Sequence, residues 1–291
     1  MKWRGRARSR NVEDRRGGRT VRRAGGGLGI GALLLLVASF FFPDAVPLLQ
    51  MVGVGGQSGG GNTVQTTGGG IDDDTKEFIA VVLKDTEDVW NAKFAESGAI
   101  HEERTDDYPE PNLVIFSGRT SSPCGPATTG SGPFYCPADK KIYIDPAFYG
   151  IMKNRLGADG DFAYAYVVAH EVAHHVQNVT GRIPQVNNYR RRVSQEKANR
   201  ATVRLELQAD CYSGYFANKK RALLEEGDIQ EALRAAFAIG DDTLQRRSGG
   251  HVDPASFTHG TSEQRVQWFF KGLEAGDLGV CDTFSQDYDE L

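Results

Sequence analysis

The segment His170-Glu-Val-Ala-His174 decides how this chain of 291 residues is interpreted, because two histidines stand four residues apart with a glutamate beside the first. On an α-helix, residues i and i+4 lie on one face about 6 Å apart, so both imidazoles can reach one tetrahedral Zn²⁺. Glu171 lies beside them, where its carboxylate can take a proton from the attacking water. The segment predicts a catalytic zinc site with His170 and His174 as ligands and Glu171 as general base.

A solvated helix with two surface histidines is the alternative interpretation, since so short a motif also arises by chance. The apolar run before the motif, residues 161–169, argues against a solvated helix, and so do Val172 and Ala173 within it. We therefore expect the motif to lie on a helix buried in a core.

A third ligand is expected because catalytic zinc sites keep three protein ligands and one open position. The segment Glu206-Leu-Gln-Ala-Asp210 provides it, in a proline-free stretch from about 187 to 220 that we expect to form a second helix. Glu206 is predicted to bind the metal, and Asp210 to accept a hydrogen bond from a ligating histidine. The alternative is an amphipathic helix with two solvated acids, but apolar residues crowd the same turn, where carboxylates rarely lie without a partner.

Several motifs together resemble the bacterial neutral zinc metallopeptidase family, gluzincin-type proteases anchored in the membrane. The resemblance runs from about Asp72 to the C-terminus, and its motifs are His170-Glu-x-x-His174, Glu206-x-x-Ala-Asp210, Thr258-His259-Gly-Thr-Ser-Glu-Gln-Arg265, Gly132–Ile144, Ala238–Asp242 and Cys281–Phe284. It implies a zincin-like domain that holds one Zn²⁺ per chain through His170, His174 and Glu206. His259 and Arg265 lie in a matching segment, and either could stabilise the oxyanion or orient Asp210 or Glu206.

The N-terminus predicts a membrane anchor. Residues 1–23 carry ten Lys or Arg and two acidic residues, and residues 24–42 are uncharged and apolar. Such a span can just cross a bilayer, and its basic flank is expected to stay cytoplasmic, which places the rest of the chain outside. A cleaved signal peptide is the competing interpretation, and a nucleic-acid-binding arm is disfavoured by the adjoining apolar run.

The remaining chain divides into a tether and one domain. Residues 43–71 are rich in Gly and are expected to form a flexible linker, which leaves residues 72–291 as the metallopeptidase domain. Beyond residue 23 the chain has 24 basic and 36 acidic residues. We therefore expect no nucleic-acid partner, and a protein or peptide as the substrate.

Four cysteines fit an extracytoplasmic domain. They allow three disulfide connectivities, of which we expect Cys124 with Cys136 and Cys211 with Cys281. The first pair would close a Gly- and Pro-rich loop, and the second would tie the C-terminal tail to the helix that carries Glu206. A second metal site is the rival interpretation, but no Cys-x-x-Cys pair exists in the chain.

The hydrophobic pattern predicts an α+β fold with a small sheet packed on the helix that carries the motif. Residues 75–95 are expected to form a helix, and residues 112–117 and 141–145 to form strands. Strand 141–145 is our candidate for an edge that pairs with extended substrate, with a plain core strand as the alternative. His101, His175 and His251 are expected to be structural or solvent-facing.

These features predict a membrane-anchored zinc metalloendopeptidase that hydrolyses peptide bonds outside the cytoplasm. A zinc-binding envelope scaffold without catalysis is the alternative from another class, and Glu171 argues against it because binding alone needs no base. An amidase that acts on cell-wall peptides would share the same metal chemistry.

Overall fold

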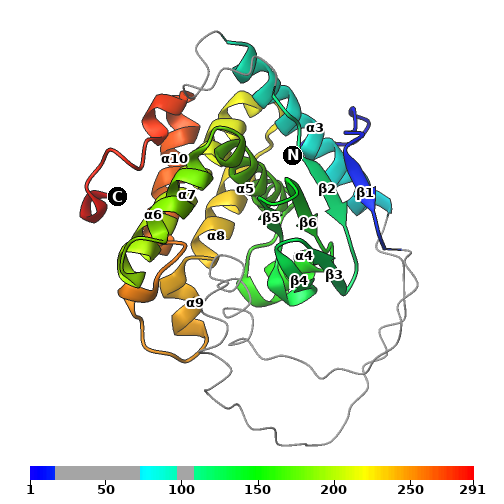
Figure 1. The fold of residues 1–291 in the computed structure, drawn as a ribbon. Helices are drawn as coiled ribbons and strands as arrows, with labels where there is room; N and C mark the ends of the chain where they lie inside the picture. Colours follow the sequence, from blue (N-terminus) through cyan, green and yellow to red (C-terminus); the bar gives the residue numbers. More distant parts are fainter. Residues whose placement is uncertain (17–72, 97–107) are drawn as a thin grey trace, which may run out of the picture.

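The computed structural model describes residues 1–16, 73–96 and 108–291 (Figure 1). Its strands are β1 (Val12–Asp14), β2 (Asn112–Ile115), β3 (Arg119–Ser122), β4 (Gly125–Thr128), β5 (Phe134–Cys136) and β6 (Lys141–Ile144). Its α-helices are α3 (Asp73–Ala95), α4 (Phe148–Ile151), α5 (Asp161–Val179), α6 (Arg182–Arg190), α7 (Gln195–Lys219), α8 (Asp228–Ala238), α9 (Asp241–Arg247) and α10 (Ser262–Ala275). The predicted α+β class is confirmed.

The main sheet has four strands in the order β1-β2-β6-β5. The pairs β1–β2 and β2–β6 are parallel, whereas β5 runs antiparallel to β6, and a separate hairpin joins β3 to β4. One face of the sheet supplies Leu113, Ile115 and Ile142 to the large core. The other face carries a small cluster around Val114, Phe116 and Tyr143. Both faces are covered, which explains why β2 and β6 are almost continuously apolar.

Helix α5 occupies the centre of the molecule, with α3, α7, α8 and the sheet around it (Figure 1). Every residue from Phe162 to Gln177 is buried. A helix that is apolar around its whole circumference needs neighbours on every side, and the run 161–169 has this composition. The core prediction for the motif is therefore confirmed.

Helices α7 and α10 approach each other closely enough to exclude side chains between their backbones. A Cβ atom on Gly214 would lie 1.9 Å from the carbonyl oxygen of Phe269, and one on Gly272 would lie 1.9 Å from that of Cys211. Only glycine fits at these two positions. The contact holds α10 against the helix that carries Glu206.

Two predicted elements need correction. The single helix expected from about 187 to 220 is two helices, because α6 ends at Arg190 and α7 begins at Gln195. The break turns α6 so that Ile183 and Val186 are buried, 5% and 4% exposed. Strand 141–145 is confirmed as β6, but β6 lies inside the sheet between β2 and β5, so it is not an edge.

The first 16 residues lie on the domain, although residues 1–23 were predicted to be a separate basic tail. They place β1 beside β2 and bury Met1, which is 4% exposed. No helix among the described residues is long and apolar enough to cross a membrane. The predicted anchor at 24–42 and the predicted linker at 43–71 lie outside the described residues.

Candidate functional site

Helix α5 presents the predicted metal ligands inside the protein. His170, Glu171 and His174 are 6%, 8% and 4% exposed. The two imidazole rings lie one turn apart with centroids 4.7 Å from each other. The alternative of two surface histidines is therefore excluded.

Glu206 comes from α7 and completes the predicted ligand set. Its two carboxylate oxygens lie 3.1 Å from His170 Nε2 and 3.4 Å from His174 Nε2. One ligand atom from each of the three residues lies within 4.8 Å of the other two. Two imidazole nitrogens and one carboxylate oxygen that converge in a buried site form a donor set that fits zinc. The residues fit the predicted metal.

Asp210 orients His170, as the spacing predicted. Its Oδ1 lies 2.9 Å from His170 Nδ1, so the Nε2 atom of the same ring faces the metal site. Tyr166 also donates to Asp210, at 2.5 Å, and Arg265 donates to it through Nε at 2.9 Å and Nη2 at 3.0 Å. Arg265, 1% exposed, therefore holds Asp210 in place, which is one of its two predicted roles.

A chain of two glutamines orients His174, and neither was predicted. His174 Nδ1 lies 2.9 Å from Gln177 Oε1, and Gln177 donates to Gln208 at 3.1 Å. Gln208 in turn donates to the carbonyl oxygen of Cys281 at 3.1 Å. Both glutamines could have been found from the sequence. Gln177 is one helical turn beyond His174, and Gln208 lies inside the segment Glu206-Leu-Gln-Ala-Asp210. The imidazole rings of His170 and His174, the predicted ligands, thus each have a fixed Nδ1 partner.

The pKa values of the three buried carboxylates shift in different directions: those of Glu206 and Asp210 are lowered, and that of Glu171 is raised. Burial raises the pKa of Glu206, but the imidazoles of His174 and His170 outweigh it and hold the pKa well below the usual range. Asp210 follows the same pattern, with Arg265 as the outweighing charge. Burial dominates at Glu171 and raises its pKa. The lowered pKa values of Glu206 and Asp210 therefore favour their anionic forms, whereas the raised pKa of Glu171 favours uptake of a proton.

His259 lines the same cavity as the predicted metal ligands and is held in place by the Asp241 carboxylate, for which no role was predicted. Asp241 Oδ1 lies 3.0 Å from His259 Nδ1, and Asp241 Oδ2 accepts the backbone N–H groups of Thr258, His259 and Gly260. Burial lowers the pKa of His259, but Asp241 outweighs it and raises that pKa. The Asp241 carboxylate thus fixes the loop and favours the imidazolium. Asp241 could have been found from the sequence as a candidate residue, because it lies in the segment Ala238–Asp242, which matches the family pattern but was given no predicted role.

A cavity of about 150 Å³ opens beside the ligands. His170, Glu171, His174, Glu206, His259 and Arg265 all line it. Its remaining wall is mostly apolar and comes from Phe134, Phe148, Met152, Leu156, Val167, Ala235, Ile239 and Leu244. Six of the predicted site residues therefore converge on one pocket, and Asp210 lies behind them in contact with His170 and Arg265.

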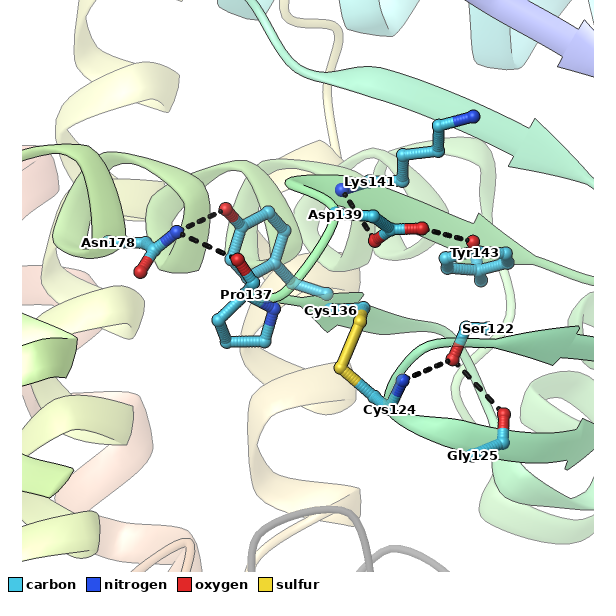
Figure 2. The surroundings of a disulfide bond; sticks show 10 residues. Ser122, Cys124, Gly125, Cys136, Pro137, Asp139, Lys141, Tyr143 and Asn178 are labelled. Carbon is cyan, nitrogen blue, oxygen red and sulfur yellow. Dashed lines mark hydrogen bonds between the residues drawn. A yellow bond between two sulfur atoms is a disulfide. The ribbon is translucent and has the colours of Figure 1, made fainter.

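The sheet edge next to this cavity is β5, which corrects the prediction of strand 141–145. β5 is the terminal strand of the sheet, and its residue Phe134 lines the cavity. Tyr135 ties β5 to α5, because Asn178 donates to its hydroxyl at 2.9 Å (Figure 2) and His175 Nδ1 lies 3.1 Å from it. His175 Nε2 donates to the carbonyl oxygen of Pro109, which leaves Nδ1 to accept from Tyr135. His175 is structural, as predicted.

Both predicted disulfides are present. Cys124 is joined to Cys136 at the end of β5 (Figure 2), and Cys211 on α7 is joined to Cys281. The second bridge lies next to the glutamine chain, since Gln208 bonds to the backbone of Cys281. Of the other predicted non-ligands, His251 is exposed and His101 lies outside the described residues.

Among the described residues, one other carboxylate cluster has the spacing of a metal site. Asp161, Asp228 and Glu231 form it. The amino group of Met1 lies in this cluster, 2.6 Å from Asp161 and 3.2 Å from Asp228. The ammonium group engages two of these carboxylates, and Glu231 accepts the backbone N–H of Phe162 at 3.0 Å, so the cluster with His170 is the candidate metal centre.

Comparison with known proteins agrees with this geometry. Residues 1–284 match the family described as "Putative neutral zinc metallopeptidase". The chain is 43% identical to "Uncharacterized protein YpfJ" of Escherichia coli (strain K12) over 297 residues, covering 98% of this chain and 99% of that protein. It is 41% identical to "Uncharacterized protein Rv2575" of Mycobacterium tuberculosis (strain ATCC 25618 / H37Rv) over 191 residues, covering 61% of this chain and 64% of that protein. No solved structure matches the chain.

Proposed function

Because the chain belongs to the neutral zinc metallopeptidase family, we propose that it is a zinc-dependent endopeptidase in which Glu171 is the general base. The observation that carries the proposal is the convergence of His170, His174 and Glu206 beside a buried carboxylate that does not join the ligand set. A zinc ion held by these three residues supplies Lewis-acid chemistry to a peptide carbonyl.

Glu171 moves the proton in this proposal. It lies in the cavity next to the proposed ligands, and burial raises the pKa of its carboxyl group above the usual value, which favours uptake of a proton. The Glu171 carboxylate takes a proton from the attacking water and passes it to the departing amine. A carboxylate whose pKa is held well below the usual range, such as that of Glu206, is less suited to carry the proton to the amine.

His259 is the proposed donor to the oxyanion. Its Nδ1 atom is engaged by Asp241, which leaves Nε2 for the cavity that the ring lines. In the imidazolium form, which Asp241 favours by raising the pKa of His259, Nε2 carries a proton that it can donate to developing negative charge. Arg265 is assigned the other task, since its Nε and Nη2 atoms both donate to Asp210.

The substrate proposed is an extended peptide with a bulky apolar residue beside the cleaved bond. β5 offers an edge with which a peptide backbone can pair, and the apolar wall lies directly next to it. An apolar cavity of about 150 Å³ is large enough to take up a benzene ring. We therefore expect Leu, Met or Phe to fill the cavity during cleavage.

The domain is proposed to act outside the cytoplasm. Both disulfides support this location, because disulfides persist in oxidising compartments and are rare in the cytosol. Its partners are then proteins or peptides of the cell envelope or the surroundings, and attachment to the membrane through residues 24–42 stays a prediction.

The first experiment separates the peptidase from a scaffold. The full chain, Glu171→Gln and the exposed control Glu196→Gln are purified, their zinc is counted, and each is incubated with a mixed peptide library. We expect about one zinc per chain in all three, since three protein ligands leave Glu171 outside the ligand set. Loss of the base should slow cleavage about 10²–10⁴-fold, with Glu196→Gln unchanged. Zinc without cleavage in the unaltered chain would favour the scaffold.

The second experiment tests the substrate class. Ala235 is 1% exposed and lines the apolar wall, so Ala235→Leu narrows the cavity without touching the metal ligands. We expect the unaltered chain to cleave beside Leu, Met or Phe, and the variant to shift toward smaller residues. An unchanged preference in Ala235→Leu would show that another surface selects the substrate.

A further inference from the structure

The basic N-terminal segment, residues 1–16, forms ion pairs with acidic residues of helix α3. Three of its arginines each pair with a different carboxylate of α3: Arg4 with Asp74 at 2.9 Å, Arg8 with Glu77 at 2.6 Å, and Arg6 with Asp85 at 2.7 Å. Arg6 engages Asp85 through both of its terminal nitrogens, and Asp85 is 2% exposed. Bidentate pairs with a buried carboxylate are the specific kind of ion pair.

The same segment satisfies a second buried carboxylate of α3. Glu87 is 2% exposed and accepts hydrogen bonds from the Ser9 hydroxyl at 2.5 Å and the Asn11 amide at 2.9 Å. Ser9 itself is 8% exposed. A buried carboxylate needs such donors, so the segment contributes to the interior of the protein and is more than a charged cover.

Backbone hydrogen bonds fix the register of the segment. The N–H of Leu113 on β2 donates to the carbonyl of Asn11 at 2.8 Å, and the N–H of Arg15 donates to the carbonyl of Ile115 at 2.8 Å. Between them β1 pairs with β2 in parallel and extends the sheet (Figure 1). A segment attracted only by opposite charge would have no reason to align its backbone in this way.

The amino group of Met1 reaches the helix that carries the zinc motif. Met1 is 4% exposed, and its amino group lies 2.6 Å from Asp161, the first residue of α5, and 3.2 Å from Asp228, the first residue of α8. Burial lowers the pKa of this amino group, but the two carboxylates outweigh it and the pKa is raised. The charged terminus thus joins the starts of α5 and α8.

We propose that residues 1–16 are a built-in edge strand of the metallopeptidase domain and that they lie on the same side of the membrane as residues 73–291. Contacts at 2.5–3.3 Å require one aqueous compartment, whereas a single crossing of residues 24–42 would put about 30 Å of hydrocarbon between the two parts. Three of the arginines that predicted a cytoplasmic flank, Arg4, Arg6 and Arg8, pair with carboxylates of α3 instead. The proposal does not depend on peptidase activity.

The test compares the two parts of the full chain in intact spheroplasts. Its own cysteines are all in disulfides, so a single new cysteine is the only free thiol. Arg10→Cys marks the N-terminal segment at an exposed position, and Asp289→Cys marks the C-terminal end, where the side chain is 90% exposed. Each variant is treated with a membrane-impermeant maleimide before and after lysis, and lysis should expose both thiols.

We expect the two cysteines to behave alike before lysis, both labelled or both protected. Labelling of one and protection of the other would overturn the proposal. A second measurement tests the contact itself: Arg6→Cys with Asp85→Cys should be joined by a short bifunctional thiol reagent in membranes, whereas Arg6→Cys with Asp289→Cys should not. Equal cross-linking of the two pairs, or cross-linking of neither, would contradict the docking.

Discussion

Replacing Arg265 by Met should destabilise the protein strongly, because it leaves the Asp210 carboxylate charged and buried. Asp210 is fully buried and receives four donor contacts, two of them from Arg265. Removing one partner of a buried ion pair costs about 3–5 kcal/mol. The double variant Arg265→Met/Asp210→Asn removes the charge as well, so its cost should fall short of the sum of the single costs by about 1–3 kcal/mol.

Urea unfolding of the chelator-treated protein measures these costs, because removal of zinc excludes stabilisation by bound metal. The control is Arg246→Met, whose ion pair with Asp242 lies at the surface and should contribute less than about 1 kcal/mol. The reasoning is refuted if Arg265→Met costs no more than the control, or if the double variant costs the full sum of its parts.

Three further predictions concern the surroundings of the metal ligands. Gln177→Met removes the partner of His174 Nδ1 and should weaken zinc binding about 10–100-fold in a competition titration, and unchanged affinity would rule out the orienting role. Gly272→Ala forces α10 away from α7 and should cost about 3 kcal/mol or more in urea unfolding, whereas Gly150→Ala, with its nearest atom 4.0 Å away, should cost almost nothing. Replacing both cysteines of the Cys211–Cys281 bridge, which closes a separation of 70 residues, should cost about 4 kcal/mol, and a loss below about 1 kcal/mol would contradict the loop-entropy argument.

The convergence of the proposed ligands could be predicted from the sequence because helical spacing fixes which side chains share a face. His170 and His174 are one turn apart, and so are Glu206 and Asp210, which places each pair on one side of its helix without further information. The apolar residues around both pairs indicated that each face is buried. Only the prediction that the two helices, α5 and α7, pack against each other relied on the family resemblance, since no local sequence pattern specifies which helices pack together.

Roles that depend on backbone paths were not readable. Asp241 precedes His259 by 18 residues, and their contact exists because the loop before α10 returns to the start of α9. Likewise the strand 141–145 was recognised, but its place inside the sheet depends on β5, a three-residue strand too short to give a periodic signal. A strand's propensity predicts that it forms, whereas its position in a sheet is decided by partners elsewhere in the chain.

The N-terminal arginines show why charge alone is an ambiguous signal. A basic stretch before an apolar run satisfies the rule for a cytoplasmic flank, and the rule uses composition over a short window. Three of the same arginines, Arg4, Arg6 and Arg8, form ion pairs with carboxylates of α3. Their partners Asp74, Asp85 and Glu77 lie about 70 to 80 residues further along the chain, and no local sequence pattern indicates the pairing. What separates the two interpretations is the uncharged residues: Ser9 and Asn11 bond to Glu87, and Asn11 accepts from the β2 backbone. A membrane flank has no need of such directional contacts, and they are the strongest reason to place residues 1–16 with the domain.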